Sequence, residues 1–521
     1  MSGHGCLRSV VLVIALIALP FDGVAGQALL DEPATEPVLL ADAGVIDEPS
    51  NTEAAGQVSV GSGSNLGTVR FYANNWTRVS GWDYFNPGST GGDPSYGYVA
   101  NRLRIGMRWQ TANTELHAAG QQVQFSGVPT SAAGPGPLGL GAAYRGQGNA
   151  STNPGGLYVR YLHFDVKKIG NTGLSFSFGR FGYSGGGEST AADSPKVNRV
   201  KAMRVTDKLI GEFGWSLYQR GFDGVRGDWT HGFGKVTVAA FQPTQGGFEN
   251  RAGISIDDIR VHTGVWTLGS VVPNSELQLF LYDYDDERNV TGFRPDGSGL
   301  KSTNGIDVRI QNAGFHLVSA NRAGSGEVDS LVWYSYQTGS WFGQTHRAQA
   351  VALEAGYQWD APMRPWLRVG YLRGTGDDDP TDQTHGTFFQ MLPTTRKYSL
   401  STAYNMMNNT DLFVQALLTP APGWSIRADY HKIGLSNAND RWYFGAGATQ
   451  AKGTVFGFGT RPSFGESSFG NVFEVQASHT INSHWSVSGY YGHIRGSNVV
   501  RGNFPGSDKF NFAYFENVLK F

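Results

Sequence analysis

Asn101-Arg102-Leu103-Arg104-Ile105-Gly106-Met107-Arg108-Trp109-Gln110 is the stretch of sequence that decides the fold. In an extended strand, successive side chains point to opposite faces. The odd-numbered positions from Leu103 to Trp109 are apolar, and the even-numbered positions carry arginine at 102, 104 and 108. One face of this segment is therefore apolar and the other cationic, which is expected of a strand that separates lipid from water.

The same alternation recurs to the end of the chain, in residues 174–179, 351–359, 426–431, 473–478 and 485–491. A soluble β-sandwich also alternates, but its outer face is rich in Lys and Glu. Here aromatic residues are expected at strand ends instead, as in the interfacial girdles of a membrane barrel. The predicted girdle residues are Trp109, Trp266, Trp333, Trp359 and Trp485. The pattern predicts an all-β fold, a transmembrane antiparallel β-barrel.

Composition narrows the function less than the strand pattern does. The 521-residue chain has 16% charged residues and a formal net charge of -2, with 72 glycines. Nucleic-acid-binding domains usually carry a basic face that shows in the total charge. We therefore expect no nucleic-acid partner, and any functional charge must be arranged locally.

The N-terminal segment predicts secretion. An apolar run from Val10 to Leu19 is followed by Pro20 and by small residues up to Gly26, so residues 1–26 are interpreted as a signal peptide. An uncleaved anchor is the alternative, but the run is short of the ~20 residues that span a bilayer. The single cysteine, Cys6, lies within this signal, so the mature chain is expected to have no disulfide and no cysteine-ligated metal.

Residues 27–57 contain no Lys or Arg and are rich in Asp, Glu and Pro. This composition predicts an acidic, disordered leader. A solvated spacer is one interpretation, and contact with a periplasmic partner or with a basic pore is the other. The barrel is then expected to span residues 58–521.

Polar and glycine-rich stretches at 81–96, 130–156, 185–197 and 434–452 are long enough for extracellular loops, with short connections as periplasmic turns. The chain ends with an aromatic-rich strand on Phe521, the form that outer-membrane assembly recognises. The predicted location is the bacterial outer membrane.

Several blocks resemble the alginate-export family of outer-membrane proteins. The strand at 102–109, the pair 157–166 and 179–180, and Gln337-Thr338-Gly339 match its early strands and its central Gln-x-Gly turn. The remaining blocks are Leu209-Ile210-Gly211 with Phe213, Trp215, Arg220 and Phe222 to Arg226, then Arg364 to Tyr371, Gly376 to Pro380, Thr387-Phe388 and Leu392-Pro393-Thr394. They appear in the family's order from about Tyr98 to Phe521.

The resemblance implies a monomeric barrel of roughly 18 strands that exports an anionic uronic-acid polysaccharide. Passage of such a polymer needs a continuous positive field and many weak contacts rather than one tight site. Guanidinium groups suit this because they stay charged and offer several donors to carboxylates.

Arginines on the polar sides of strands, or in family blocks, are the candidate pore-lining residues. They are Arg102, Arg104, Arg108, Arg160, Arg180, Arg226, Arg368 and Arg427. The alternative is that each one only braces the barrel by pairing with a neighbouring carboxylate, such as Glu115, Asp223, Asp228, Glu354 or Asp429.

Acidic and histidine residues offer weaker candidates. Asp377, Asp378 and Asp379 form a weak candidate for calcium, although they lack the ligand spacing of a calcium loop and are also typical of a solvated turn. His163 with Asp165, and Asp429 with His431, are neighbours on one strand face and suit lumen hydrogen bonds better than a catalytic pair. No catalytic residues and no cofactor are predicted.

Three functions remain open from the sequence. The first is a channel for an anionic polysaccharide, alginate-like, or its oligomers. The second is a general or substrate-specific porin for small sugars or organic anions. The third is an outer-membrane hydrolase or lipid A-modifying enzyme. Expected partners are outer-membrane lipids and lipopolysaccharide, the transported anion, and a periplasmic protein at the leader.

Overall fold

The computed structural model describes residues 57–59, 67–89, 91–133, 151–191, 194–247, 251–269, 273–290, 296, 305–394, 396–401, 403–453 and 456–521. The signal peptide and the leader up to residue 56 lie outside these residues. The predicted boundaries at 26 and 57 therefore stay predictions.

The described elements are almost all strands, as the alternating pattern requires. In chain order they are β1 Gln57–Ser59, β2 Thr68–Asp83, β3 Ser95–Gln110, β4 Thr114–Ser126, β5 Gly155–Val166, β6 Leu174–Phe181, α3 Pro195–Arg204, β7 Phe222–His231, β8 Gly234–Pro243, β9 Ile259–Gly269, β10 Ser275–Asp286, β11 Val308–Ala323, β12 Gly326–Trp341, β13 Gln344–Trp359, β14 Trp366–Gly374, β15 Thr384–His385, β16 Asn409–Leu418, β17 Trp424–Gly434, β18 Arg441–Gly445, β19 Phe458–Pro462, β20 Ser468–Asn482, β21 Trp485–Gly496, α4 Asn498–Asn503 and β22 Lys509–Lys520. None of the helices in the described ranges is long and apolar enough to cross a membrane.

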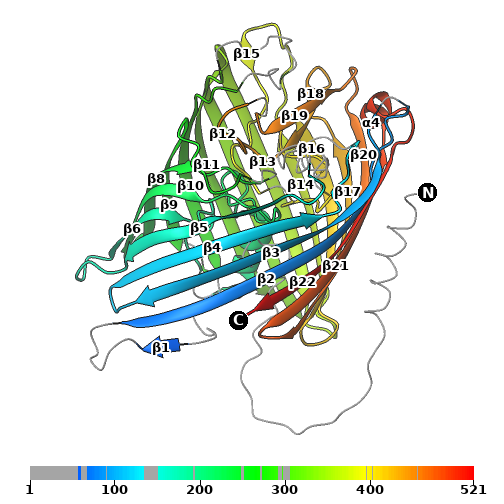
Figure 1. Ribbon diagram of the computed structural model, residues 1–521. Coiled ribbons are helices and arrows are strands. Elements are labelled where there is room, and N and C mark those ends of the chain that lie inside the picture. Colours follow the sequence, from blue (N-terminus) through cyan, green and yellow to red (C-terminus); the bar gives the residue numbers. More distant parts are fainter. Residues whose placement is uncertain are drawn as a thin grey trace.

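The strands form a closed antiparallel barrel (Figure 1). The main sheet has 20 strands, of which β1 and β15 are short additions at the ends, so 20 - 2 leaves 18 barrel strands. β2 pairs with β3 on one side and with the last strand, β22, on the other, which closes the sheet. A closed sheet has no edge strand and can satisfy all its backbone groups within lipid. The predicted barrel and its strand number are confirmed.

The alternation of side chains matches the two faces of the barrel. In β3, Arg102 and Arg104 are fully buried in the interior, while Ile105, which follows Arg104, is exposed on the outside. The outward faces of β13 and β20 carry Leu353 and Phe473 in the same way. The apolar face predicted from the sequence is therefore the lipid-facing one.

The prediction that all five tryptophans form an outward girdle was wrong for one of them. Trp266, Trp359 and Trp485 are outward and exposed, but Trp333 is buried in the interior. It lies on the inward face of β12, where its ring packs against Phe388. Its position near other aromatic residues in the sequence did not reveal that its side chain falls on the other face of the strand.

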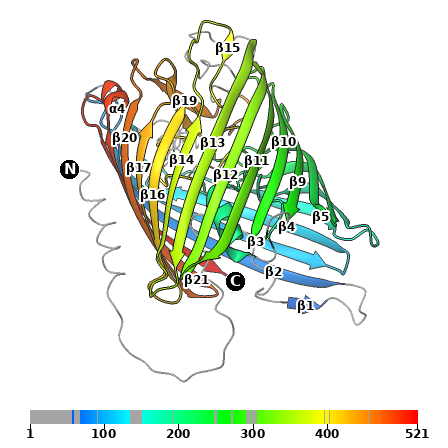
Figure 2. The same cartoon turned by 180° about the vertical axis from the view of Figure 1, so that it is seen from behind.

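The two ends of the barrel differ in the length of their connections (Figures 1 and 2). One end carries short turns such as 111–113, 324–325 and 483–484, and the C-terminus lies there, with Phe521 N donating to Ala73 O at 2.8 Å. The other end carries the long connections, including 182–221, 375–408 and 435–467. Short turns mark the periplasmic end of an outer-membrane barrel, so the long connections belong to the extracellular end.

The block Gln337 to Gly339 is not a turn, contrary to the expectation taken from the family. It lies inside β12, and the turn to β13 is formed by Phe342 and Gly343. Gly339 has a φ of +139°, and a Cβ there would meet the carbonyl oxygen of Arg309 on β11. The glycine therefore allows a close approach of two strands rather than a reversal of the chain.

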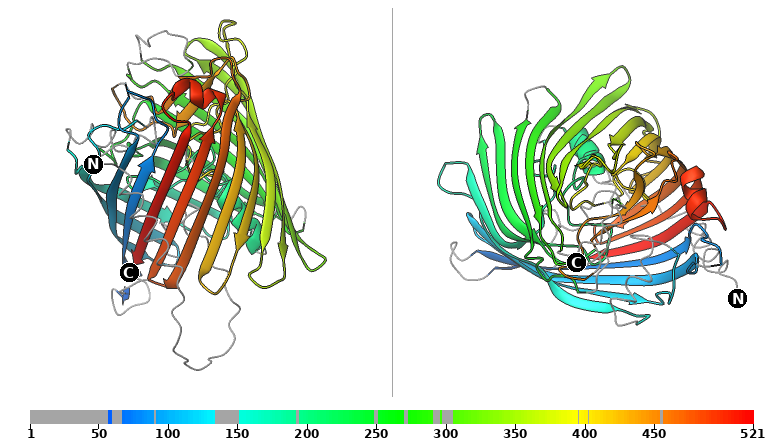
Figure 3. Two further views of the ribbon diagram at one scale, coloured as in Figure 1. Left: turned by 90° about the vertical axis from the view of Figure 1, so that its right-hand side faces the viewer. Right: turned by 90° about the horizontal axis from the view of Figure 1, so that it is seen from above.

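Two of the long connections fold back into the lumen. The predicted loop at 185–197 is part of the 182–221 connection, here named insert A, which contains helix α3. The 375–408 connection, insert B, contains β15. The view from above shows α3 inside the barrel wall (Figure 3). Insert A turns inward because Val197, Val200 and Met203 of α3 are apolar and bury against the wall.

Candidate functional site in the barrel lumen

Helix α3 presents its cations to the wall. Ser194 caps the helix, with its hydroxyl accepting from Val197 N at 3.4 Å, and Pro195 begins it. The last turn carries Lys201 and Arg204, which complement the negative end of the helix dipole. Both side chains are buried, so each needs a carboxylate nearby.

The wall supplies these carboxylates from neighbouring strands. Lys201 Nζ lies 2.5 Å from Glu276 Oε1 on β10, and His316 Nε2 on β11 contacts the same oxygen at 3.2 Å. Arg204 Nε lies 3.4 Å from Glu354 Oε2 on β13. These pairs attach insert A to the inner wall.

Glu354 joins two buried arginines. Its Oε2 also lies 2.9 Å from Arg368 Nη1 on β14, and Arg368 Nε donates to Asp329 Oδ1 on β12 at 3.0 Å. All four side chains, including Arg204, are fully inaccessible to solvent. We name Arg204, Asp329, Glu354 and Arg368 the buried quartet. Removing one charge from such a group leaves its partner buried without compensation.

Inserts A and B are bonded to each other in the lumen. Leu392 N donates to Leu209 O, and Gly211 N donates to Leu392 O, both at 2.8 Å. Gln337 on the wall holds insert B through Phe389, donating to its carbonyl and accepting from its amide at 2.8 Å each. Three separate family blocks therefore meet here, as contacts between the inserts and the wall.

Two insert cations are buried and form no ion pair with a carboxylate of the described residues. Lys208 Nζ donates to the Tyr398 hydroxyl at 2.9 Å and lies 4.5 Å from the centre of the Trp333 ring. Burial lowers the pKa of Lys208 to about 7. Arg220 Nη2 donates to Ala446 O at 2.6 Å, and burial lowers its pKa to about 10. The inserts thus bring poorly solvated positive charge into the lumen.

Seven of the eight arginines predicted to line the pore lie on the inward faces of their strands. Arg180 does not: it pairs in register with Leu162 and shares a face of β6 with the exposed Phe178, so the prediction that it lines the pore was wrong. Five are buried: Arg102, Arg104, Arg160, Arg368 and Arg427. The other two inward arginines keep partly exposed side chains, at 17% for Arg108 and 22% for Arg226. We name Arg108 and Arg226 the accessible arginines.

Insert A covers several of the buried arginines. Gln219 Oε1 accepts from Arg102 Nη1 at 3.1 Å and from Arg104 Nη2 at 2.6 Å. Glu212 pairs with Arg160. These contacts belong to the segment that follows α3, so the inward arginines of β3 and β5 face the insert rather than open water.

In the structure, each of the five carboxylates named as possible bracing partners pairs with one of the candidate arginines. The distances are 3.7 Å for Arg108–Glu115, 2.6 Å for Arg180–Asp223, 2.8 Å for Arg226–Asp228 and 2.9 Å for Arg368–Glu354, and Arg427 also contacts Asp429. An anion in the lumen would therefore have to compete with carboxylates that belong to the protein.

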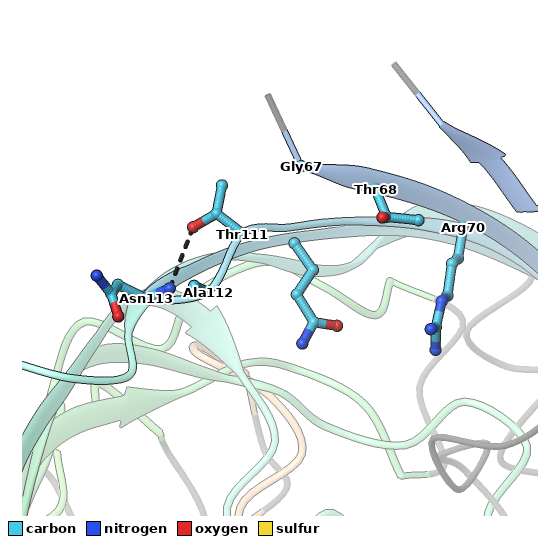
Figure 4. Close-up of a pocket in the computed structure, with 7 residues that line it drawn as sticks. Gly67, Thr68, Arg70, Thr111, Ala112 and Asn113 are labelled. Carbon is cyan, nitrogen blue, oxygen red and sulfur yellow. Dashed lines mark hydrogen bonds between the residues drawn. The ribbon is translucent and has the colours of Figure 1, made fainter. Parts of the chain in front are cut away.

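A recess of about 530 Å³ opens at the short-turn end, between the start of β2 and the β3–β4 turn (Figure 4). It is lined by Gly67, Thr68, Arg70, Gln110, Thr111, Ala112 and Asn113. Thr111 Oγ1 accepts from Asn113 N at 3.2 Å and shapes the turn. The recess places the cation of Arg70 at the end of the barrel where a periplasmic solute would enter.

The cations of insert A were not predicted from the sequence. Residues 195–208 carry Lys196, Arg199, Lys201, Arg204 and Lys208, and this density was the available signal. It was overlooked because the segment does not alternate with a period of two. The wall acids Glu276 and Glu474 were missed because a single inward carboxylate leaves no pattern.

The acidic run in insert B forms a turn. Asp377 Oδ1 accepts from Asp379 N at 3.2 Å, and Asp379 Oδ1 accepts from the Thr381 amide and hydroxyl at 3.0 and 2.6 Å. Asp440 Oδ2, on the 435–467 connection, accepts from Asp377 N at 2.9 Å. Burial, together with the nearby Asp440 charge, raises the pKa of Asp377 to about 6.

The predicted histidine pairs have separate surroundings. His163 Nδ1 lies 3.2 Å from Asp165 Oδ1. His431 pairs with Asp411 at 3.0 Å, whereas Asp429 pairs with Arg427. Asp429, His431 and Glu474 do bring three potential metal-ligand atoms together, yet each is already engaged in these ion pairs or, for Glu474, by the Tyr490 hydroxyl at 2.6 Å.

The 18-strand barrel, its long loops at one end and its arginine-bearing interior define an outer-membrane porin-like channel. Solved structures share this architecture at low sequence identity. The BenF-like porin from Pseudomonas fluorescens Pf-5 is 9% identical with a TM-score of 0.55, OccK9 (OpdG) from Pseudomonas aeruginosa is 10% identical with 0.53, and OccAB2 from Acinetobacter baumannii is 8% identical with 0.52. Each match covers 87% of this chain and 98% of the other.

The family model for alginate export matches residues 195–511, more than half of the chain. The protein therefore belongs to the alginate export family, and its place is the bacterial outer membrane. No curated protein sequence matches it. The family and the porin-like neighbours point to a transport channel.

Proposed function

We propose that the protein passes an anionic polysaccharide, an alginate-like polyuronate or its oligomers, through an arginine-lined lumen that inserts A and B close. Catalysis has no part in this proposal. Membership of the alginate export family supports the polymer as cargo. The observation that carries the proposal is that seven of the predicted arginines lie on inward strand faces, where Arg108, Arg226, Arg368 and Arg427 hold carboxylates.

Exchange of partners is the proposed mode of passage. A guanidinium that already binds Glu115 or Asp228 can bind the carboxylate of a sugar with the same geometry. Each exchange replaces one ion pair by a similar one, so no single position holds the polymer tightly. The accessible arginines would make the first contacts, and the buried ones would become available when the inserts move.

A second candidate is a porin for small organic anions. The observation that favours it is the burial of five of the eight arginines, with Gln219 and Glu212 of insert A against them. If the inserts stay in place, only the accessible arginines can meet a solute, and a small anion fits that situation better than a polymer.

Conductance of the full-length mature protein in planar bilayers separates these candidates. Under a salt gradient, the reversal potential should indicate preference for anions. Polyuronate chains of defined length, added on the short-turn side, should then block the current in a manner that depends on length. Cation selectivity would contradict both candidates. Block by monomeric anions with no effect of polymers would favour the small-solute porin.

A further inference from the structure

A row of cations crosses the outer face of the barrel at its extracellular end. Lys432 of β17 pairs in register with Asn471 of β20, Asn471 with Arg495 of β21, and Arg495 with Lys509 of β22. All four side chains are exposed and lie on the lipid-facing side of their strands. We name Lys432, Arg495 and Lys509 the outer basic row. Neighbouring strands are about 4.8 Å apart, so the row spans roughly 14 Å.

The row lies at the border between the apolar band and the polar rim. One step towards the periplasm on the same face are Tyr430 and Phe473, which pair with each other and are 51% and 49% exposed. One step in the other direction the strands end in the 435–467 and 497–508 connections. At this depth a membrane presents the polar headgroups of its outer leaflet.

The residues that the structure describes do not neutralise the charges of the outer basic row. Among the described residues, no carboxylate forms an ion pair with any of the three. The nearby acids are used elsewhere: Asp83 accepts from Asn511 at 3.1 Å, Asp508 pairs with Arg501 at 2.8 Å, and Glu466 accepts from Asn498 at 3.0 Å.

A second group of outward cations on β9 and β11 provides the contrast. Arg260 and Arg309 flank Asp285 in one register row. Arg309 lies 3.2 Å from Asp285 and 2.6 Å from Glu287, and Arg260 lies 3.5 Å from Asp285. These arginines are also exposed, at 53% and 60%, but the protein compensates their charges.

We propose that the outer basic row binds the phosphate groups of a phosphorylated glycolipid of the outer leaflet, the lipid A part of lipopolysaccharide. Lys and Arg form strong charge-assisted hydrogen bonds to phosphate oxygens. The exposed rings of Tyr430 and Phe473 offer an apolar surface for the acyl chains just below the phosphates. The site faces lipid and is separate from the lumen, so it is independent of the proposed cargo.

Native mass spectrometry of the full-length protein in detergent tests this site. The ligand is bisphosphorylated lipid A, and the main variant is K432Q with R495Q and K509Q. The matched control, R260Q with R309Q, also removes exposed cations from the outer face. We expect at least about tenfold weaker binding in the triple variant and little change in the control, because only the first group lacks internal partners.

Measurements with other ligands test whether the phosphate groups of lipid A are what the site recognises. Dephosphorylated lipid A should bind the wild type as weakly as intact lipid A binds the triple variant, and inorganic phosphate alone should not compete. Equal binding of lipid A to the wild type and the triple variant would overturn the proposal. So would competition by free phosphate or by polyuronate, or an equal loss in the control.

Folding is checked by the heat-dependent shift of the barrel in gel electrophoresis. The variant K432R with K509R keeps the charges and should retain binding. If the triple variant does not fold, R495Q alone should still weaken binding of the phosphorylated lipid, and unchanged binding would contradict the site.

Discussion

The buried quartet and the accessible arginines use the same chemistry in two different settings. Arg368 and Arg226 each project inward from a barrel strand, and each lies within 3 Å of a carboxylate. Arg368 is fully enclosed by the wall and insert A, whereas Arg226 keeps 22% of its side chain exposed. Burial, rather than residue type or pairing, separates the two groups.

This difference assigns them different tasks. A buried ion pair that loses one member is left with an uncompensated charge, so the quartet can hold α3 firmly against the wall. A partly exposed pair is weakened by solvent screening and exchanges partners more easily. The quartet therefore fits the role of a latch for insert A, and the accessible arginines fit the role of first contacts for an anion.

The largest expected effect comes from breaking the latch. Glu354→Gln should leave Arg204 and Arg368 without their shared charge and destabilise the docked insert by about 3–5 kcal/mol. The open fraction of single channels in planar bilayers should rise strongly. Asp360→Asn serves as the control, because Asp360 pairs with Arg322 at an exposed turn and should alter neither property. If the Glu354→Gln channel has the same open fraction as the wild type, the buried quartet does not control gating.

A smaller effect is expected from the accessible arginines. Replacing Arg108 and Arg226 together with Gln should lower the preference for anions by about two- to fivefold, since it removes exposed positive charge from the lumen. The reversal potential under a salt gradient measures this. The variant R260Q with R309Q is the control, because those cations lie outside the barrel. An unchanged reversal potential would show that the anion does not pass these residues.

The smallest effect concerns pH. The pKa of Lys208 falls to about 7 in the folded protein, compared with 10.5 for an ordinary lysine. Between these values the unfolded chain holds a proton that the folded protein has released, so Lys208 makes stability rise with pH from about 7 to 10.5. Urea unfolding in lipid vesicles should show this rise, and Lys208→Met should flatten it. If the stability of Lys208→Met depends on pH as that of the wild type does, a group other than Lys208 causes the rise.

The barrel was predictable from the sequence because each strand repeats one simple pattern. Arg102 and Ile105 could be assigned to opposite faces from their positions alone, and the acids that pair with Arg108, Arg226 and Arg427 lie close in sequence or on neighbouring strands. The strand number came from the family resemblance. Alternation by itself does not count strands.

The inserts could not be predicted in the same way. Insert A contains a helix whose contacts, Lys201–Glu276 and Arg204–Glu354, join residues 75 and 150 positions apart. No local pattern records such pairs. Trp333 was misassigned for a related reason, since its role depends on Phe388 of insert B packing against it. The lumen is thus closed by tertiary contacts that only the structure reveals.

Locking insert B to the wall tests the central claim most directly. His346 of β13 and His385 of β15 are register partners, with their Nδ1 atoms 2.9 Å apart, so H346C with H385C suits a disulfide. The mature chain is predicted to have no other cysteine. We expect anion current and polyuronate block to disappear when the pair is oxidised and to return on reduction, with the two single-cysteine variants unaffected. Equal current in the oxidised and reduced channel would contradict the proposal that the inserts gate an anion conduit.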